Sequence, residues 1–263
     1  MKMKKITYIL LLFTAAFASC KKNELVETST YTKINAGDPA NSYIRFINMT
    51  PGSPISNYYL NGVKISGGST TTGIEAGFTY ASSFPNGGGQ YVPAKVRDNS
   101  LEVKIIGPAL IDPGLSIFKT TVNTSAGKYY SLITSGVYNT VDKKIPSSIL
   151  IEEVKPALDT SKIFVRLINL FNDGVSNIDM VQQTTGQVII PNVAFGTASD
   201  FTVIPSPGQS NIYRFLNTGT TTPVAATTLT AQLIKGQAYT IILRGVNGST
   251  VTPFGVSFYS SFY

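Results

Sequence analysis

The sequence predicts an all-β fold in which two antiparallel β-sandwich domains follow one another along the chain. The composition favours strands over helices, because Thr, Ser, Val, Ile, Tyr and Phe are abundant and only 13% of the residues are charged. Several segments alternate apolar and polar residues with the period of a strand. One set of segments also occurs twice in the same order, which indicates two copies of one domain.

The first residues of the chain have the layout of an export signal. The basic start MKMKK precedes an apolar run, and the small residues Ala18 and Ser19 stand before Cys20. A helix that crosses a bilayer needs ~20 apolar residues, and this run is shorter. We therefore expect residues 1–19 to be a lipoprotein signal peptide that is cleaved, rather than a permanent membrane helix.

Cys20 is the only cysteine in the chain, and it stands at the expected cleavage point. The stretch FASC resembles the lipobox of bacterial lipoproteins, with Phe17 in place of the usual Leu. The resemblance implies that Cys20 carries a diacylglyceryl group and an amide-linked acyl chain such as palmitate, which meets the two-chain condition for stable anchoring. We expect an outer-membrane lipoprotein that faces the periplasm or the cell surface. The alternative is a stray cysteine that is lost with the signal.

Residues 20–41 are polar and show no strand or helix period, so we expect a flexible tether between the lipid and the first domain. The duplicated segments divide the rest of the chain. Residues 42–156 are predicted to form the first sandwich, and residues 157–263 the second. With Cys20 committed to lipid there is no disulfide, and a hydrophobic core must stabilise each domain.

The duplication is clearest in three pairs of segments. YIRFINM at 43–49 matches FVRLINL at 164–170, and a turn-forming stretch follows each. GKYYSLITSGV at 127–137 matches GQAYTIILRGV at 236–246, with a glycine before and after each strand. Alignment of Pro146 with Pro253 then places SSILIEE opposite FGVSFYS. Three matches in one order indicate a duplicated domain of roughly 110 residues rather than a solenoid.

Within each copy the sequence predicts short strands and tight turns. Asn61-Gly62 lies between YYL and VKI and favours a type I′ hairpin turn. The segments LEVKI at 101–105, TTLTAQL at 227–233 and VSF at 256–258 alternate with period two, which predicts sheets with one apolar face. Several short antiparallel strands in each copy are typical of an immunoglobulin-like sandwich.

The order IRFIN–turn–YYLNG, followed by VRLIN–turn–NIDM and NVAFGTASDFTVIPSPG, resembles the DUF4397 family. Members of that family are secreted or lipid-anchored bacterial proteins with β-sandwich domains, often in tandem. The resemblance covers about residues 42–250, and its central segment, Val193 to Pro205, is clearest in the second copy. In the first copy GGSTTTG and PNGGGQ interrupt that segment. The resemblance implies a fold and an envelope location, and no activity.

The residues that carry most enzyme chemistry are missing. The chain has no histidine, and Cys20 is its only thiol, which excludes Ser-His-Asp and Cys-His sites. The fourteen acidic residues are dispersed, and we interpret the adjacent pair Glu152-Glu153 as a solvated strand end. We therefore expect no catalytic residue, no metal site, no cofactor and no enzymatic activity. A carboxylate pair of the glycosidase type remains the alternative.

Four side chains are candidate ligand contacts. Arg45 and Arg166 are charges inside otherwise apolar strands, at matching positions of the two copies. They are expected to pair with a carboxylate or to reach a sheet edge, and the alternative is an anion contact. Tyr58 and Tyr130 belong to tyrosine pairs that either fill the core or stack on a sugar.

These features together favour a lipid-anchored cell-envelope protein that displays two non-catalytic sandwich domains for binding or adhesion. The partners are the membrane, through the lipid on Cys20, and an envelope protein or a glycan. Nucleic acid is not expected, because the Lys and Arg residues are scattered rather than clustered. The alternative function is a carbohydrate-binding accessory lipoprotein of a glycan uptake system, which exposed, coplanar aromatic side chains would favour.

Overall fold

The structure is a computed structural model that describes residues 34–262, except 36, 87–88, 158, 173–176 and 205–210. The chain falls into two units, Met1–Asn35 and Ala36–Tyr263, and the strands of the described residues lie in the second unit. The predicted signal peptide, Cys20 and the tether as far as residue 33 lie outside the described residues. The described residues contain no helix, and so none that is long and apolar enough to cross a membrane.

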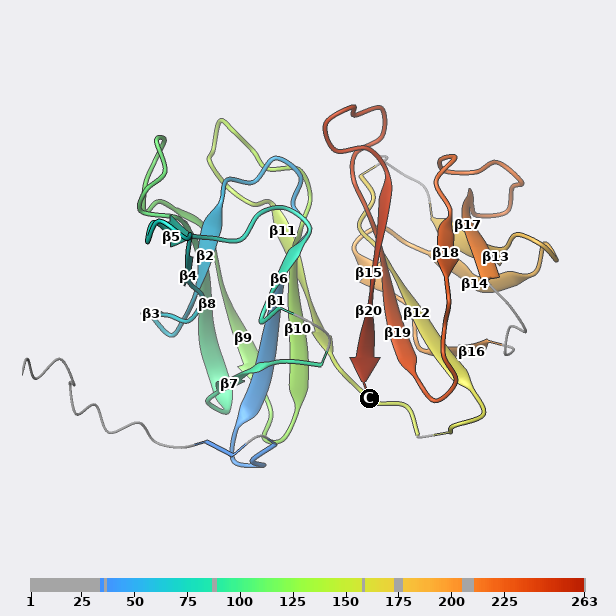
Figure 1. The fold of residues 1–263 in the computed structure, drawn as a ribbon, viewed down its shortest axis with the longest axis horizontal. Coiled ribbons are helices and arrows are strands. Elements are labelled where there is room, and N and C mark those ends of the chain that lie inside the picture. The colour runs from blue at the N-terminus through green and yellow to red at the C-terminus, as the bar shows by residue number, and fades with distance from the viewer. Residues whose placement is uncertain are drawn as a thin grey trace, which may run out of the picture. The chain divides into compact units, whose positions relative to one another are not determined.

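The first copy consists of two packed sheets and a small ribbon (Figure 1). Its inner sheet has the order β11 (Ser147–Glu152), β10 (Tyr129–Ser135), β1 (Ser42–Asn48) and β6 (Ser82–Phe84), and β7 (Val92–Ala94) also pairs with β1. Its outer sheet has the order β3 (Val63–Lys64), β2 (Ser56–Leu60), β8 (Arg97–Ile105) and β9 (Ser116–Thr124). The ribbon pairs β4 (Gly68–Ser69) with β5 (Glu75–Ala76).

The second copy repeats the two sheets of the first copy strand for strand. Its inner sheet has the order β20 (Gly255–Phe262), β19 (Ala238–Arg244), β12 (Ile163–Asn169) and β15 (Thr197–Ala198), and β16 (Thr202–Ile204) also pairs with β12. Its outer sheet has the order β14 (Val188–Val193), β13 (Ile178–Gln182), β17 (Asn211–Asn217) and β18 (Leu229–Ala231). The predicted all-β fold of two β-sandwiches is confirmed, whereas the boundary at residues 156 and 157 stays a prediction.

One strand pair in each copy departs from the predicted antiparallel pattern. β1 pairs with β10 in parallel, and β12 pairs with β19 in parallel. Between β1 and β10 the chain passes through the outer sheet, so the returning strand enters from the same end as β1. The same path through the second copy gives the second parallel pair. Period-two patterning carries no information on strand direction.

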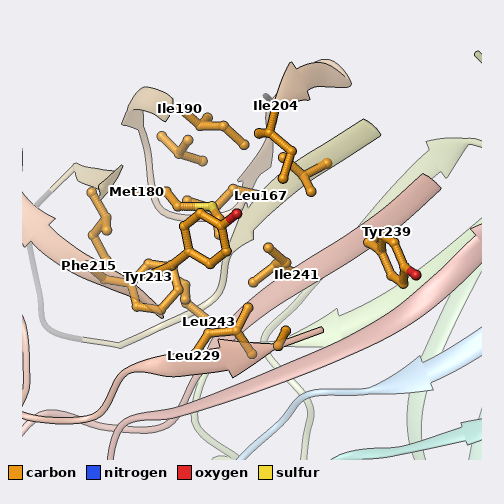
Figure 2. Packing of buried hydrophobic residues seen from close by; sticks show 14 of the residues in the cluster. Leu167, Met180, Ile190, Ile204, Tyr213, Phe215, Leu229, Tyr239, Ile241 and Leu243 are labelled. Carbon is orange, nitrogen blue, oxygen red and sulfur yellow. The ribbon is translucent and has the colours of Figure 1, made fainter. Parts of the chain in front are cut away.

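Three hydrophobic clusters separate the four sheets. One fills the first sandwich, and another fills the second, where Leu167, Ile241 and Leu243 of the inner sheet face Met180 and Tyr213 of the outer sheet (Figure 2). The third cluster is the contact between the two inner sheets, and its buried members are Ile47, Met49, Ile133, Ile168, Leu170 and Ile242.

This contact between the inner sheets is formed by the same positions of both copies. The first copy contributes Ile47, Met49 and Ile133, and the second contributes their counterparts in the duplicated segments, Ile168, Leu170 and Ile242. The inner strands are therefore buried on both faces. Burial on both faces explains why YIRFINM and FVRLINL read as nearly continuous apolar runs.

The third predicted match between the copies is correct in its strands and wrong in its register. Leu132 pairs with Leu150, and its counterpart Ile241 pairs with Phe258. Leu150 therefore corresponds to Phe258 and not to Ser257. The loop between β10 and β11 covers residues 136–146, and the matching loop between β19 and β20 covers residues 245–254. The loop of the second copy is therefore one residue shorter. Pro146 stands ten positions after Gly136 and Pro253 only eight after Gly245, so alignment of the two prolines shifts the register by one residue.

Two turn features agree with the residues that form them. Asn61 and Gly62 have φ angles of 51° and 81°, as the predicted type I′ turn requires. Asn48 and Asn169, which end β1 and β12, each make an Asx turn. The side-chain oxygen of Asn48 accepts the amide of Thr50 at 3.1 Å. Asn169 accepts the amide of Phe171 in the same way.

Candidate functional site: a buried arginine cluster, a groove and an apolar pocket

Arg45 and Arg166 lie on the facing inner sheets and share one carboxylate. Arg45 Nη2 donates to Glu153 Oε1 at 3.4 Å, and Arg166 Nη2 donates to the other oxygen, Oε2. The three side chains are 2%, 4% and 0% exposed for Arg45, Arg166 and Glu153. A carboxylate buried to this degree is stable only with such partners. The expected pairing of both arginines with a carboxylate is confirmed.

The surroundings of the two arginines are duplicated as well. Arg45 lies over the ring of Tyr91 at 5.1 Å, and Arg166 lies over the ring of Phe201 at 4.8 Å. Tyr91 directly precedes β7, and Phe201 directly precedes β16. The structure therefore shows which residues of the two copies correspond in the segment that the insertions of the first copy interrupt. Phe201 belongs to the FTVI stretch on which the family resemblance rests.

The buried carboxylate of Glu153 has no counterpart in the second copy. In the first copy Ser131 Oγ donates to Glu153 at 2.5 Å. In the second copy the matching hydroxyl pair is Thr240 with Ser261, so Ser261 stands where an acid would be. Among the described residues, Glu153 is the only ion-pair partner of either arginine. Two guanidinium groups and one carboxylate leave one positive charge in excess.

The sequence interpretation of Glu152-Glu153 is half correct. Glu152 is exposed and pairs with Lys128 at 2.8 Å, as expected of a solvated strand end. Glu153 is buried, with 5% of the whole residue exposed, which corrects the interpretation. The spacing along β11 indicated this burial, because a strand returns to the same face every second residue. Ile149 and Ile151, which precede Glu153 at that spacing, pack against the contact between the inner sheets.

Tyr58 and Tyr130 are core residues, which corrects their candidate role as sugar contacts. Tyr58 is 2% exposed, its ring lies 4.9 Å from that of Phe46, and burial raises the pKa of its hydroxyl. Tyr130 is also buried, and its hydroxyl accepts the amide of Ser125 at 3.0 Å. Neither ring is placed to stack on a ligand.

A groove of ≈ 440 Å³ opens beside Arg45, between the edges of the two inner sheets. Ser82 and Ser83 of β6 line one side, and Ser257, Phe258 and Tyr259 of β20 line the other. The ring of Tyr259 covers the Arg45 guanidinium at 4.1 Å, and its hydroxyl is buried with no hydrogen-bond partner in the part of the chain that the structure describes. Phe258 is 48% exposed.

A pocket of ≈ 690 Å³ lies at one end of the first sandwich, where the loops after β1, β8 and β10 meet. Its lining is mainly apolar: Pro54, Ile55, Ile105, Ile106, Pro108, Ala109, Leu110 and Ile111. Leu110 is fully exposed and Ile111 is 75% exposed. Lys143 pairs with Asp112 at 2.8 Å at the rim. The volume lies within the range of about 300–1,000 Å³ that ligand pockets span.

The described residues hold no group of three or more His, Cys, Asp or Glu side chains arranged to bind a metal ion. No family model matches the chain, and no curated protein matches it. The DUF4397 resemblance therefore stays a prediction.

Several solved structures show a distant likeness. A carbohydrate-binding module of family CBM26 from Eubacterium rectale Amy13K, in complex with maltoheptaose, is 14% identical and covers 85% of this chain and 98% of its own, with a TM-score of 0.25. A proposed cell adhesion protein from Bacteroides eggerthii is 11% identical and covers 87% and 98%, with a TM-score of 0.23. A proposed cell adhesion protein from Bacteroides fragilis is 11% identical and covers 84% and 98%, with a TM-score of 0.19. Likenesses with TM-scores this low carry no argument about function, so the function is inferred from the chain's own residues.

Proposed function

We propose that this chain is a lipid-anchored protein of the bacterial cell envelope, of the DUF4397 type, that displays two non-catalytic β-sandwich domains for binding or adhesion. The export signal and Cys20 support the location. The observation that carries the binding role is the apolar pocket at the loop end of the first sandwich. Its occupant is an apolar group of a partner.

The placement of this pocket favours contact with a partner. Leu110 and Ile111 lie in the loop between β8 and β9 as exposed apolar side chains, and grouped exposed apolar side chains are typical of contact surfaces. The chain enters the first sandwich at Ser42, whereas the pocket uses the loop that follows Asn48 at the other end of β1. A partner therefore reaches the pocket from the end opposite to the point where the tether enters.

The pocket is tested with a neutral apolar probe, N-phenyl-1-naphthylamine, whose fluorescence rises on transfer from water. We expect residues 21–263 to bind it with saturation, and Leu110→Asp combined with Ile111→Asp to weaken binding about tenfold, because two carboxylates would have to be desolvated beside the probe. The control is Val251→Asp, which changes a side chain that is 88% exposed and outside this pocket. Equal binding by all three proteins would contradict the binding role.

The lipid anchor is tested separately by labelling a Gram-negative host with radioactive palmitate. We expect the full chain to incorporate the label and to fractionate with the envelope. Cys20→Ser is expected to lose both properties, because no other thiol is available for acylation. An unlabelled wild-type chain, or a labelled Cys20→Ser chain, would refute the anchor and leave the pocket result unaffected.

A further inference from the structure

The Arg45 guanidinium has an incomplete set of charge partners. It contacts Ser131 of β10, Glu153 after β11 and the rings of Tyr91 and Tyr259. Arg166 of β12 pairs with the other oxygen of the same carboxylate. Glu153 bonds closely to Arg166 and to Ser131, and it lies 3.4 Å from Arg45. Arg45 is therefore the less neutralised of two buried cations that share one anion.

Two hydroxyl groups beside this guanidinium also lack an interaction partner. The oxygens of Tyr91 and Tyr259 are buried and have no hydrogen-bond partner among the described residues. Burial raises the pKa of the Tyr91 hydroxyl, so it stays a neutral donor. Buried donors without an acceptor are costly, and so is a buried cation without a counter-charge. One anion beside Arg45 and the Tyr259 hydroxyl, which both belong to the groove, would provide the acceptor and the counter-charge.

The groove provides the route by which an anion reaches Arg45. Arg45 and Tyr259 form part of its lining, and serine hydroxyls of β6 and β20 stand along it. Phe258 adds an exposed apolar surface on the β20 side. The lining is thus part polar and part apolar, with a cation at one position. Its volume of ≈ 440 Å³ lies within the range of about 300–1,000 Å³ that ligand pockets span.

We propose that this groove binds the carboxylate of a small organic acid, with Arg45 as the charge partner and the Tyr259 hydroxyl as a hydrogen-bond donor. The shared chemistry is the carboxylate, and its source is either the acidic sugar of a glycan or a simple carboxylic acid. The site is separate from the loop-end pocket and goes beyond the proposed function.

The second copy lacks one of the hydroxyl groups that lie beside Arg45, and this difference supports the assignment. Phe201 stands over Arg166 where Tyr91 stands over Arg45, so the matching hydroxyl is absent. Arg166 also has the closer contact with Glu153 and a hydrogen bond from Nε to Thr240 at 2.8 Å. The hydroxyl donors thus accompany the arginine that needs a further anion.

The test is isothermal titration calorimetry of the full mature chain, lipidated and in detergent, at constant ionic strength. The probes are sodium glucuronate, sodium acetate, glucose and sodium chloride, at up to about 20 mM so that millimolar dissociation constants are measured. We expect glucuronate to bind and glucose to give no signal. Binding of acetate as well assigns the site to the carboxylate alone, whereas its failure assigns it to an acidic sugar.

Three variants locate the binding. Arg45→Met is expected to abolish it, and Tyr259→Phe to weaken it about tenfold, because a hydrogen bond to a charged group is lost. Tyr58→Phe is the matched control, since it removes another buried hydroxyl without a partner, in the core of the first sandwich. Should Arg45→Met not fold, Tyr259→Phe decides, because it removes a single oxygen.

The proposal is overturned if neither glucuronate nor acetate binds. It is also overturned if chloride binds as tightly as glucuronate, which would mean an adventitious ion only, or if Tyr259→Phe binds like the wild type. None of these results affects the apolar-probe or palmitate experiments, so failure of this site is distinguishable from failure of the proposed function.

Discussion

Replacement of Glu153 by Gln is expected to lower the free energy of unfolding by about 3–5 kcal/mol. The substitution keeps the size of the side chain and removes its charge. Arg45 and Arg166 would then remain buried as two like charges without a carboxylate. Urea denaturation followed by circular dichroism measures the loss as a lower midpoint at an unchanged slope.

The neighbouring residue provides the control for this experiment. Glu152→Gln removes the same charge one position earlier, where the ion pair with Lys128 is about half exposed. Exposed pairs contribute about 0–1 kcal/mol, so this variant is expected to unfold close to the wild type. Equal losses in the two variants would show that burial of Glu153 has no energetic consequence.

Gly245→Ala is expected to cost about 3 kcal/mol or more, because it combines backbone strain with a steric clash. Gly245 follows β19 with φ +108°, and a Cβ there would stand 2.1 Å from the backbone oxygen of Pro253. No side-chain rotation relieves a contact with backbone. Thermal unfolding measures the loss, and hydrogen exchange should show it first in β19 and β20, which flank the loop.

Gly248→Ala separates the clash from the backbone strain. This glycine lies in the same loop with φ +74°, and a Cβ there would meet no atom of the described residues within 4 Å. The variant is expected to cost about 1–2 kcal/mol, the penalty of a left-handed conformation alone. A Gly245→Ala chain as stable as Gly248→Ala would mean that the loop moves away from Pro253 without cost.

The sequence predicted the strands, the turn and the duplication because each depends on local pattern. Asn61-Gly62 specifies its own turn, and LEVKI alternates because one face of β8 meets the core. The sequence did not predict the contact between the inner sheets, because period-two patterning assigns one apolar face to each strand. The unbroken apolar character of YIRFINM was the available sign that β1 is buried on both faces.

The candidate site was predicted only in part. Arg45 and Arg166 were recognisable as charges in apolar strands, and pairing with a carboxylate was expected. The identity of the acid was not predicted, because Glu153 lies 108 residues from Arg45 in sequence and stands beside the exposed Glu152. The groove and the loop-end pocket were not predictable either, since each is lined by segments far apart in the chain.

The shared carboxylate is tested most directly by repeating Glu153→Gln in a chain that also carries Arg45→Met and Arg166→Met. In that background Glu153 is a buried carboxylate without a cation, so its replacement is expected to leave the free energy of unfolding unchanged or to raise it. The loss of about 3–5 kcal/mol expected in the wild-type background should therefore disappear. A loss of the same size in both backgrounds would contradict the conclusion that one carboxylate neutralises the arginines of both copies.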